Sequence, residues 1–300
     1  MDKLIGIAGS AASELCVDGL RHGFIVQDCM INNKQYDGSE KKFGITVNGI
    51  DYLVKFKKRD WTNVLSEVIA SNFINECGGL SHDVYLGEYN GDTVAICRDF
   101  TKQYGNLETI KSINSSSMDT DKENHEYYFD DVKYELSKIH GIDYESAVRS
   151  FILMYGFDSI LGNTDRHMGN WGFCNKDGIQ TFSPIFDNGA SLFPRNKTYI
   201  IDEDWMKERI YTFPNSKLMF NDKRERSSYY QVWRSDILPE DIKSFFRSIP
   251  IKYKLVQTLA DIPISDDLKN YYATVVYYRF NGIVNDKFEW EGILNWRTSI

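Results

Sequence analysis

The chain has 300 residues, of which 42% are hydrophobic and 14% aromatic, enough to bury a substantial core in one large domain or two modest lobes. Its formal net charge of -8 argues against a surface built to neutralise nucleic-acid phosphates or anionic lipid. The five cysteines are widely spaced and include no CxxC pair, which favours neither a disulfide framework nor a zinc ribbon. No apolar run reaches membrane-spanning length, so we expect a cytoplasmic protein that contacts neither membrane nor nucleic acid directly.

The first hundred residues predict a small β-sheet crossed by one helix. After an irregular stretch over residues 1–35, apolar residues alternate along 41–58 around an Asn-Gly turn, which predicts a β-hairpin. Apolar residues then recur at helical spacing, beginning after Thr62 or Asn63 as a candidate cap and ending at a Gly-Gly pair. A second pair of short strands is expected over 84–96, again across Asn-Gly.

Helices are expected to dominate after residue 100. Residues 112–126 have few apolar side chains and indicate an exposed loop, and helical periodicity runs from Val132 to Ser159. Residues 171–187 are the exception, since they predict two short strands around an Asp-Gly turn. The stretch 188–230 is long and polar, and we interpret it as a segment that contacts substrate. Amphipathic helices return in the C-terminal part of the chain.

The loop that follows the helical segment carries the first candidate chemistry. It reads GNTDRHMGNWGF, with Asp165 and Asn170 five residues apart, and Asp187 follows the predicted hairpin. Phosphoryl transfer from ATP needs a carboxylate that accepts the proton of the attacking hydroxyl and oxygen ligands that hold Mg²⁺ against the phosphates. Asp165 would be that carboxylate, and Asn170 and Asp187 would be the oxygen ligands. One amide and one carboxylate are enough, because Mg²⁺ takes its remaining ligands from phosphate and water.

A cation for the phosphates is the second requirement. Lys55 is a single basic residue in the apolar strand YLVKF, so its stem can lie along the sheet while its ammonium group reaches a ligand. Glu67, in the first predicted helix, is the natural partner of that ammonium group. At about 4 Å and an effective dielectric constant near 20, the gross attraction would be about 4 kcal/mol before desolvation is subtracted.

A phosphate-covering turn is the third part. The sequence DGSEKK precedes the first strand of the hairpin, and Gly38 would let backbone amides approach a phosphate group, with Lys41 or Lys42 as added charge. Each part also has an ordinary structural interpretation: an Asp-x-His loop is more often a simple turn, and Lys55 and Glu67 alone are more often surface groups. The order of all the parts along one chain favours the catalytic interpretation.

The segments NTDRHMGN and PIFDNG resemble the catalytic loop and metal-binding segment of the HipA-like serine/threonine protein kinases. The similarity extends, with decreasing strength, from about residue 37 to residue 190, and phosphoinositide kinases share a similar Asp-Arg-His-x-x-Asn loop. This resemblance implies an α+β, bilobal protein-kinase-like fold. Its small β-rich N-lobe, with a Gly-rich turn and one main helix, would cover 1–100, and its larger, mostly helical C-lobe would cover 101–300.

The resemblance also implies a role for each candidate residue. Asp165 would be the catalytic base, Asn170 and Asp187 would hold Mg²⁺, Lys55 would contact the ATP phosphates, and Glu67 would orient Lys55. His167 would brace the loop, and the segment Ile96–Phe100 would be the hinge that presents backbone groups to adenine. The remaining residues assigned to the nucleotide site are Gly38, Ser39, Lys41, Arg98 and Phe100.

The chain looks like the short members of the family, because the full-length toxins carry a further N-terminal subdomain of about a hundred residues. Ser39 is the candidate for a self-inhibitory autophosphorylation, although it follows Gly38 where the family's serine tends to precede the glycine. By resemblance, the substrate would be a translation component such as an aminoacyl-tRNA synthetase, or a host protein if a bacterium secretes the chain. A small antitoxin would be a further partner.

Three alternatives stay open on the residues alone. The shared loop suggests a phosphoinositide-type lipid kinase, for which a basic membrane-facing patch is expected, whereas residues 221–226 are of mixed sign. An inactive kinase-fold binding module is disfavoured because every polar catalytic residue type is present. A metallohydrolase built on Asp165, His167 and Asp187 is disfavoured because no other histidine clusters with them.

Overall fold

The computed structural model describes residues 24–25, 30–34, 41–59, 62–114, 127–196, 200–213, 218–219 and 227–298. The predictions on Gly38 and Ser39, and on the mixed-charge segment 221–226, lie outside these described residues. Within them, no helix combines the length and the apolar character needed to cross a membrane.

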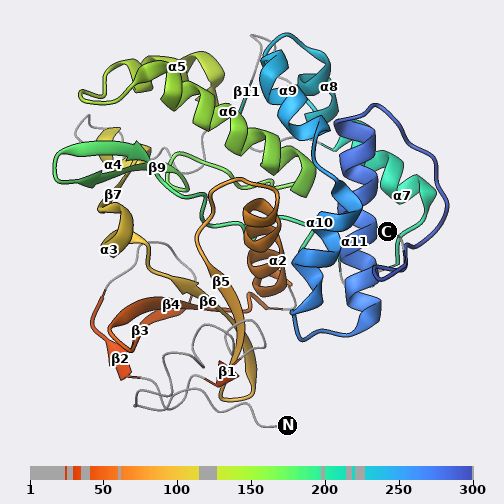
Figure 1. Cartoon of the computed structure of the whole chain (residues 1–300), viewed down its shortest axis with the longest axis horizontal. Coiled ribbons are helices and arrows are strands. Elements are labelled where there is room, and N and C mark those ends of the chain that lie inside the picture. Colours follow the sequence, from red (N-terminus) through yellow and green to blue (C-terminus); the bar gives the residue numbers. More distant parts are fainter. Residues whose placement is uncertain are drawn as a thin grey trace.

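A six-stranded sheet occupies the lower part of the molecule in Figure 1, with the helix α2 (Asn63–Glu76) against one face. The strand order is β1-β5-β6-β4-β3-β2, and every pairing is antiparallel except that of β1 with β5. The strands are β1 (Phe24–Ile25), β2 (Met30–Asn32), β3 (Lys42–Val47), β4 (Ile50–Phe56), β5 (Val84–Tyr89) and β6 (Asp92–Arg98). Both predicted hairpins and the predicted helix are therefore confirmed.

The turns of these hairpins follow from their sequences. Asn48 and Gly49 both have positive φ, at 51° and 75°, and Asn90 and Gly91 repeat the pattern at 52° and 82°. Two successive positive φ values define the type I′ turn, whose twist matches that of paired strands and which Asn-Gly adopts readily. The register of the β3–β4 hairpin brings Lys42 opposite Lys55 and leaves successive side chains on alternate faces of the sheet.

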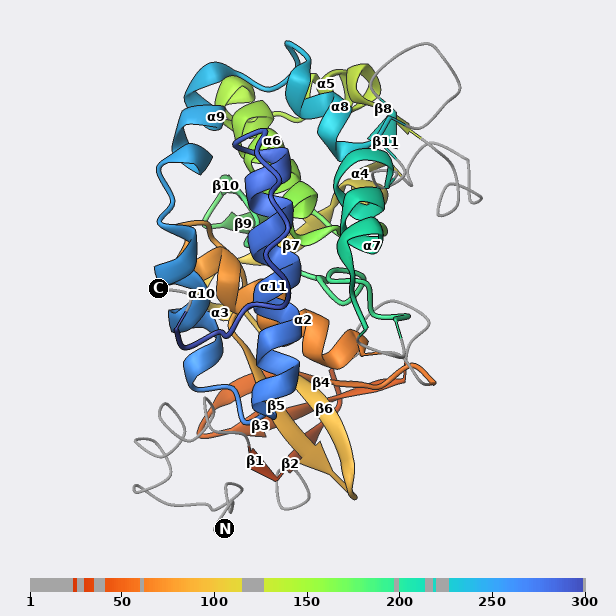
Figure 2. The same cartoon turned by 90° about the vertical axis from the view of Figure 1, so that its right-hand side faces the viewer.

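The second part of the chain is mostly helical, and α6 and α11 are its long central helices (Figure 2). The helical segments are α3 (Thr101–Tyr104), α4 (Ile110–Asn114), α5 (Phe129–Ser137), α6 (Tyr144–Leu161), α7 (Glu203–Lys207), the π-helix η2 (Glu208–Thr212), α8 (Tyr229–Arg234), α9 (Glu240–Arg247), α10 (Ile251–Ala260) and α11 (Asp266–Ile283). The short strands are β7 (Asn106–Thr109), β8 (Tyr127–Tyr128), β9 (Gly172–Lys176), β10 (Ile179–Phe182) and β11 (Leu218–Met219).

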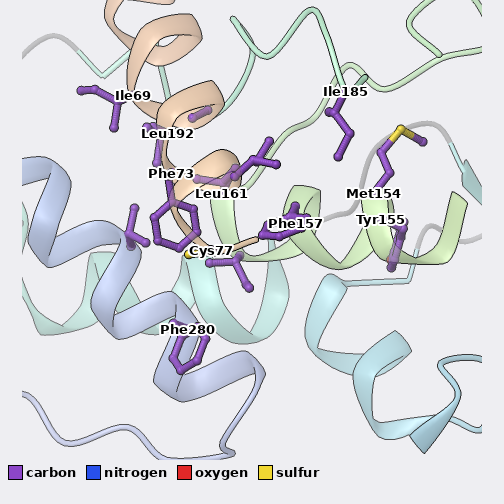
Figure 3. Close-up of a cluster of buried hydrophobic side chains, with 14 of the residues drawn as sticks. Ile69, Phe73, Cys77, Met154, Tyr155, Phe157, Leu161, Ile185, Leu192 and Phe280 are labelled. Atoms are coloured by element: carbon purple, nitrogen blue, oxygen red, sulfur yellow. The ribbon is translucent and has the colours of Figure 1, made fainter. Parts of the chain in front are cut away.

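A continuous apolar core joins the sheet, through α2, to the helical part. Figure 3 shows this core where side chains of α2, α6 and α11 meet, among them Phe73, Phe157, Leu161 and Phe280, together with Cys77 directly after α2, each 6% exposed or less. Because α2 packs between the sheet and α10, its orientation depends on both parts of the molecule. The residues Val54, Phe56, Val94 and Ile96 face the other side of the sheet and belong to a second, smaller cluster.

Three expectations differ from the structure. The stretch 1–35 contains β1 and β2, which are too short to give a local pattern and owe their conformation to pairing with β5 and β3. The predicted loop 112–126 begins inside α4, and β7 was not expected at all. The stretch 188–230 is polar overall, yet Leu192 and Ile210 within it are fully buried, so this segment also contributes to the core.

Candidate active site

Lys55, Glu67 and Asp187 meet although they come from three distant segments. Lys55 lies on β4, Glu67 on α2, and Asp187 on the segment that follows β10. Lys55 Nζ is 3.2 Å from Glu67 Oε2 and 2.9 Å from Asp187 Oδ1. The Glu67 side chain is 3% exposed and that of Lys55 is 11% exposed, whereas the Asp187 side chain is 41% exposed. The Lys55–Glu67 pair is thus shielded from solvent on the α2 side and open to solvent on the side of Asp187.

Burial and charge act in opposite directions on the pKa values of this pair. Burial lowers the pKa of Lys55, but the carboxylates of Asp187 and Glu67 outweigh it and hold the pKa well above its usual range. Burial likewise raises the pKa of Glu67, while the ammonium group of Lys55 and the hydrogen bond with His82 hold it well below its usual range. Both groups therefore stay ionised at neutral pH.

The loop that carries Asp165 begins where α6 is forced to end. Gly162 takes the left-handed conformation, at φ 67° and ψ 37°, that commonly terminates a helix. Asn163 then turns back on the helix, since its side-chain Nδ2 donates to Asp158 Oδ1 at 3.0 Å. Its Oδ1 accepts the backbone N–H of Asp165 at 3.0 Å. Asp165 itself is exposed and accessible to a substrate group.

Arg166 is buried between the loop and the segment that carries Asp187, and sequence reasoning missed it. Its guanidinium group donates to both carboxylate oxygens of Asp158, at 2.8 and 2.9 Å, and to the backbone carbonyl of Asn170 at 2.9 Å. It also donates to the carbonyl of Phe186 at 2.5 Å. One buried side chain therefore fixes the loop next to the residue that precedes Asp187.

Asn170 and His167 complete the loop. Asn170 Nδ2 donates to the backbone carbonyl of Asp165 at 3.0 Å, which leaves the amide oxygen of Asn170 available for a cation. His167 Nδ1 accepts the backbone N–H of Gly169 at 3.0 Å, so the ring braces the turn. An amide oxygen together with the carboxylate of Asp187 is a donor set that fits Mg²⁺.

Asn188 links this loop to α2 and was also missed. Its Oδ1 accepts from Arg166 Nη2 at 2.8 Å, and its Nδ2 donates to Ser71 Oγ of α2 at 2.9 Å. Asn188 and Ser71 are fully buried. The only signal in the sequence is the position of Asn188 next to Asp187, because no local pattern reveals that its side chain is buried.

The predicted hinge residues differ in what they offer. The ring of Phe100 lies 5.9 Å from that of Phe186 and 6.4 Å from that of His82, between centroids, and forms an apolar wall of the site. The backbone N–H groups of Arg98 and Asp99 already donate to other carbonyls, so neither serves an adenine ring. The Arg98 side chain pairs with Asp83, at 3.1 Å between Nη1 and Oδ2.

Lys41 is another predicted residue that the structure does not bring to the Lys55 cluster. Its Nζ lies 4.3 Å from the centroid of the Phe56 ring. Because Phe56 follows Lys55 directly on β4, the two side chains point to opposite faces of the sheet. The structure thus assembles the Lys55 cluster and the Asp165 loop side by side, with Lys41 on the other face.

Comparison of this chain with known sequences and structures identifies its family. No family model matches the chain. The curated serine/threonine-protein kinase CtkA of Helicobacter pylori is 30% identical over 219 residues, which are 67% of this chain and 67% of that protein. The crystal structure of this proinflammatory kinase CtkA matches with a TM-score of 0.76 at 26% identity, over 88% of this chain and 96% of that one.

A chain of the Shewanella oneidensis HipA–HipB–operator DNA complex matches with a TM-score of 0.60 at 14% identity. That match covers 84% of this chain and 66% of the other, and at this identity it shows a shared fold alone. The expected α+β, bilobal protein-kinase-like fold is confirmed. CtkA is similar to this chain in sequence over two thirds of both proteins, and in structure over most of both. The chain therefore belongs to the HipA-like serine/threonine protein kinase family.

Proposed function

We propose that this kinase uses Asp165 as the base that accepts the proton of a protein Ser or Thr hydroxyl while the γ-phosphate of ATP is transferred to it. The observation that carries the proposal is the position of Lys55 Nζ between Glu67 Oε2 and Asp187 Oδ1, at 3.2 and 2.9 Å. A lysine held in this way can contact phosphate oxygens on the open side of Asp187, because Glu67 fixes its ammonium group from the buried side.

The remaining residues would place the second reactant and a metal ion. The amide oxygen of Asn170 and the carboxylate of Asp187 would hold Mg²⁺, which neutralises charge on the phosphate oxygens when it is bound. Arg166 ties the backbone beside both residues together through Asn170 O and Phe186 O. The exposed carboxylate of Asp165 then faces an incoming hydroxyl while its backbone is fixed by Asn163.

The test is phosphate transfer from radiolabelled ATP with Mg²⁺ to a generic protein substrate and to the kinase itself. Asp165→Asn and Asp187→Asn should each lower the rate by about 10²–10⁴, the range expected when a general base or its equivalent is lost. Asp177→Asn is the matched control, because Asp177 is an exposed acid in the β9–β10 turn with a positive φ of 54° that asparagine also adopts. Equal rates in the wild type and both site variants would refute the assignment.

The lobe boundary and the partners belong to the same proposal. An N-lobe over 1–100 and a C-lobe over 101–300 are supported by the end of β6 at Arg98 and the start of α3 at Thr101. From the family we also propose a translation component or a host protein as substrate, a small antitoxin partner and a cytoplasmic location. Phosphoproteomics that compares cells expressing the wild type with cells expressing Asp165→Asn would identify the substrate. Transfer of labelled phosphate to phosphoinositide in vesicles would indicate the lipid-kinase alternative instead.

A further inference from the structure

His82 is a buried histidine that the proposed mechanism does not use, and it lies against the residue that orients Lys55. It is 6% exposed and precedes β5. Its Nε2 is 3.1 Å from Glu67 Oε1, whereas Lys55 Nζ contacts the other carboxylate oxygen, Oε2. Because an ionised carboxylate only accepts hydrogen bonds, Nε2 must carry the proton and donate to Glu67.

Glu67 is therefore held by donors from three different segments. Besides Lys55 on β4 and His82 before β5, the backbone N–H of Asn188 donates to the same carboxylate. The segment after Asp187 approaches so closely that a Cβ atom on Gly189 would lie 3.1 Å from Glu67 Oε2. A rotation of α2 that withdrew Glu67 from the site would break its ion pair with Lys55 and its hydrogen bonds with His82 and Asn188 in a buried place, where each is costly to lose.

The backbone of His82 is fixed to the same segment. His82 N–H and Ser81 Oγ–H both donate to the carbonyl of Ile185, at 3.1 and 2.7 Å. Ile185 lies two residues before Asp187, and Ser81 and Ile185 also form a parallel β-bridge. The backbone that carries the imidazole ring is thus fixed, and the ring contacts the carboxylate oxygen of Glu67 that Lys55 does not contact.

A metal ion would be the other use of this place, since the donor atoms of Glu67, His82 and Cys97 lie within 4.8 Å of one another. Burial raises the pKa of the Cys97 thiol well above its usual range, although the nearby Lys55 lowers it, so the thiol stays protonated. A cation there would also lie beside the positive charge of Lys55, which already pairs with the same carboxylate. The hydrogen-bonding role adds no such charge.

The geometry points to His82 as a positioning residue that acts through Glu67 and holds α2 in its inward, catalytic position whether or not a nucleotide is bound. This inference rests on the proposed function, in which Lys55 contacts the ATP phosphates. In such a kinase the Lys–Glu pair is assembled by a third side chain from the N-lobe. Basal activity then needs no separate event to draw α2 inward.

The experiment compares His82→Phe, which removes the donor and keeps an aromatic ring, with His82→Gln, whose amide can still donate to Glu67. His82→Phe should lower kcat/KM for ATP by at least about tenfold, and His82→Gln should recover most of that loss. Ser66→Ala is the matched control, because Ser66 neighbours Glu67 on α2 and its buried hydroxyl has no hydrogen-bond partner in the described part of the chain. It should match the wild type.

A double-variant cycle tests the route through Glu67. If His82 acts through that carboxylate, His82→Phe should cause no further loss in a Glu67→Gln background, whereas independent effects would multiply. Hydrogen exchange of the α2 amides without nucleotide provides a readout that needs no catalysis: His82→Phe should accelerate it and Ser66→Ala should not. Any one of three results would overturn the inference. They are a His82→Phe activity within twofold of the wild type, effects of His82→Phe and Glu67→Gln that multiply, and α2 hydrogen exchange that His82→Phe leaves unchanged. Equal transfer by the wild type and Asp165→Asn would instead overturn the proposed function, and the exchange result would still decide the role of His82.

Discussion

Replacing Arg166 by methionine should destabilise the protein strongly, because it removes one half of a buried ion pair. The Arg166 and Asp158 side chains are 3% and 1% exposed, and Arg166 makes further hydrogen bonds to the carbonyls of Asn170 and Phe186 and to the Asn188 side chain. Methionine fills much of the same volume but leaves the Asp158 carboxylate without its cation. Removal of one partner from a buried pair costs about 3–5 kcal/mol, a large part of the roughly 5–15 kcal/mol by which most domains are stable.

The assay is unfolding in urea, followed by tryptophan fluorescence, since Trp171 and Trp233 are buried in the helical part. Arg149→Met is the matched control, because the Arg149–Asp241 pair has both side chains more than half exposed and should be worth at most about 1 kcal/mol. Adding Asp158→Leu to Arg166→Met should recover part of the lost free energy of unfolding, since the unpaired buried charge is then gone. If Arg166→Met unfolds at the same urea concentration as Arg149→Met, the reasoning from burial fails.

Two more outcomes can be measured on the same protein. Burial raises the pKa of Asp51, but a threonine hydroxyl and the ammonium groups of Lys34 and Lys102 lower it from 3.8 to about 2. Since the folded-state pKa is depressed, Asp51 should stabilise the protein above about pH 4 and lose that contribution as the pH falls towards 2. Asp51→Asn should therefore flatten the fall of Tm over that window, and an unchanged pH profile would contradict the assignment. Gly172→Ala should lower Tm by several degrees, because its Cβ would lie 2.1 Å from the backbone oxygen of Glu108 on the paired strand β7, and a Tm equal to that of the wild type would show that the strands can separate without cost.

Much of the local structure could be predicted from the sequence, because it depends on residues near one another in the chain. The Asn48-Gly49 pair adopts the left-handed conformations of a type I′ turn, and the Asp177-Gly178 pair does the same in the β9–β10 hairpin. The apolar spacing along α2 and α6 predicted both helices. Candidate site residues could be chosen for the same reason, since Asp165 and Asn170 share one loop.

The tertiary structure alone decided which of these residues meet and what holds them. Lys55 and Asp187 are 132 residues apart, and their contact depends on how the sheet packs against the helical part. Arg166 and His82 are polar residues without a periodic pattern, so the sequence could not show that both are buried. A hydrogen bond between distant segments depends on the relative placement of two packed bodies, whereas a turn or helix depends on torsion angles and spacing that neighbouring residues set.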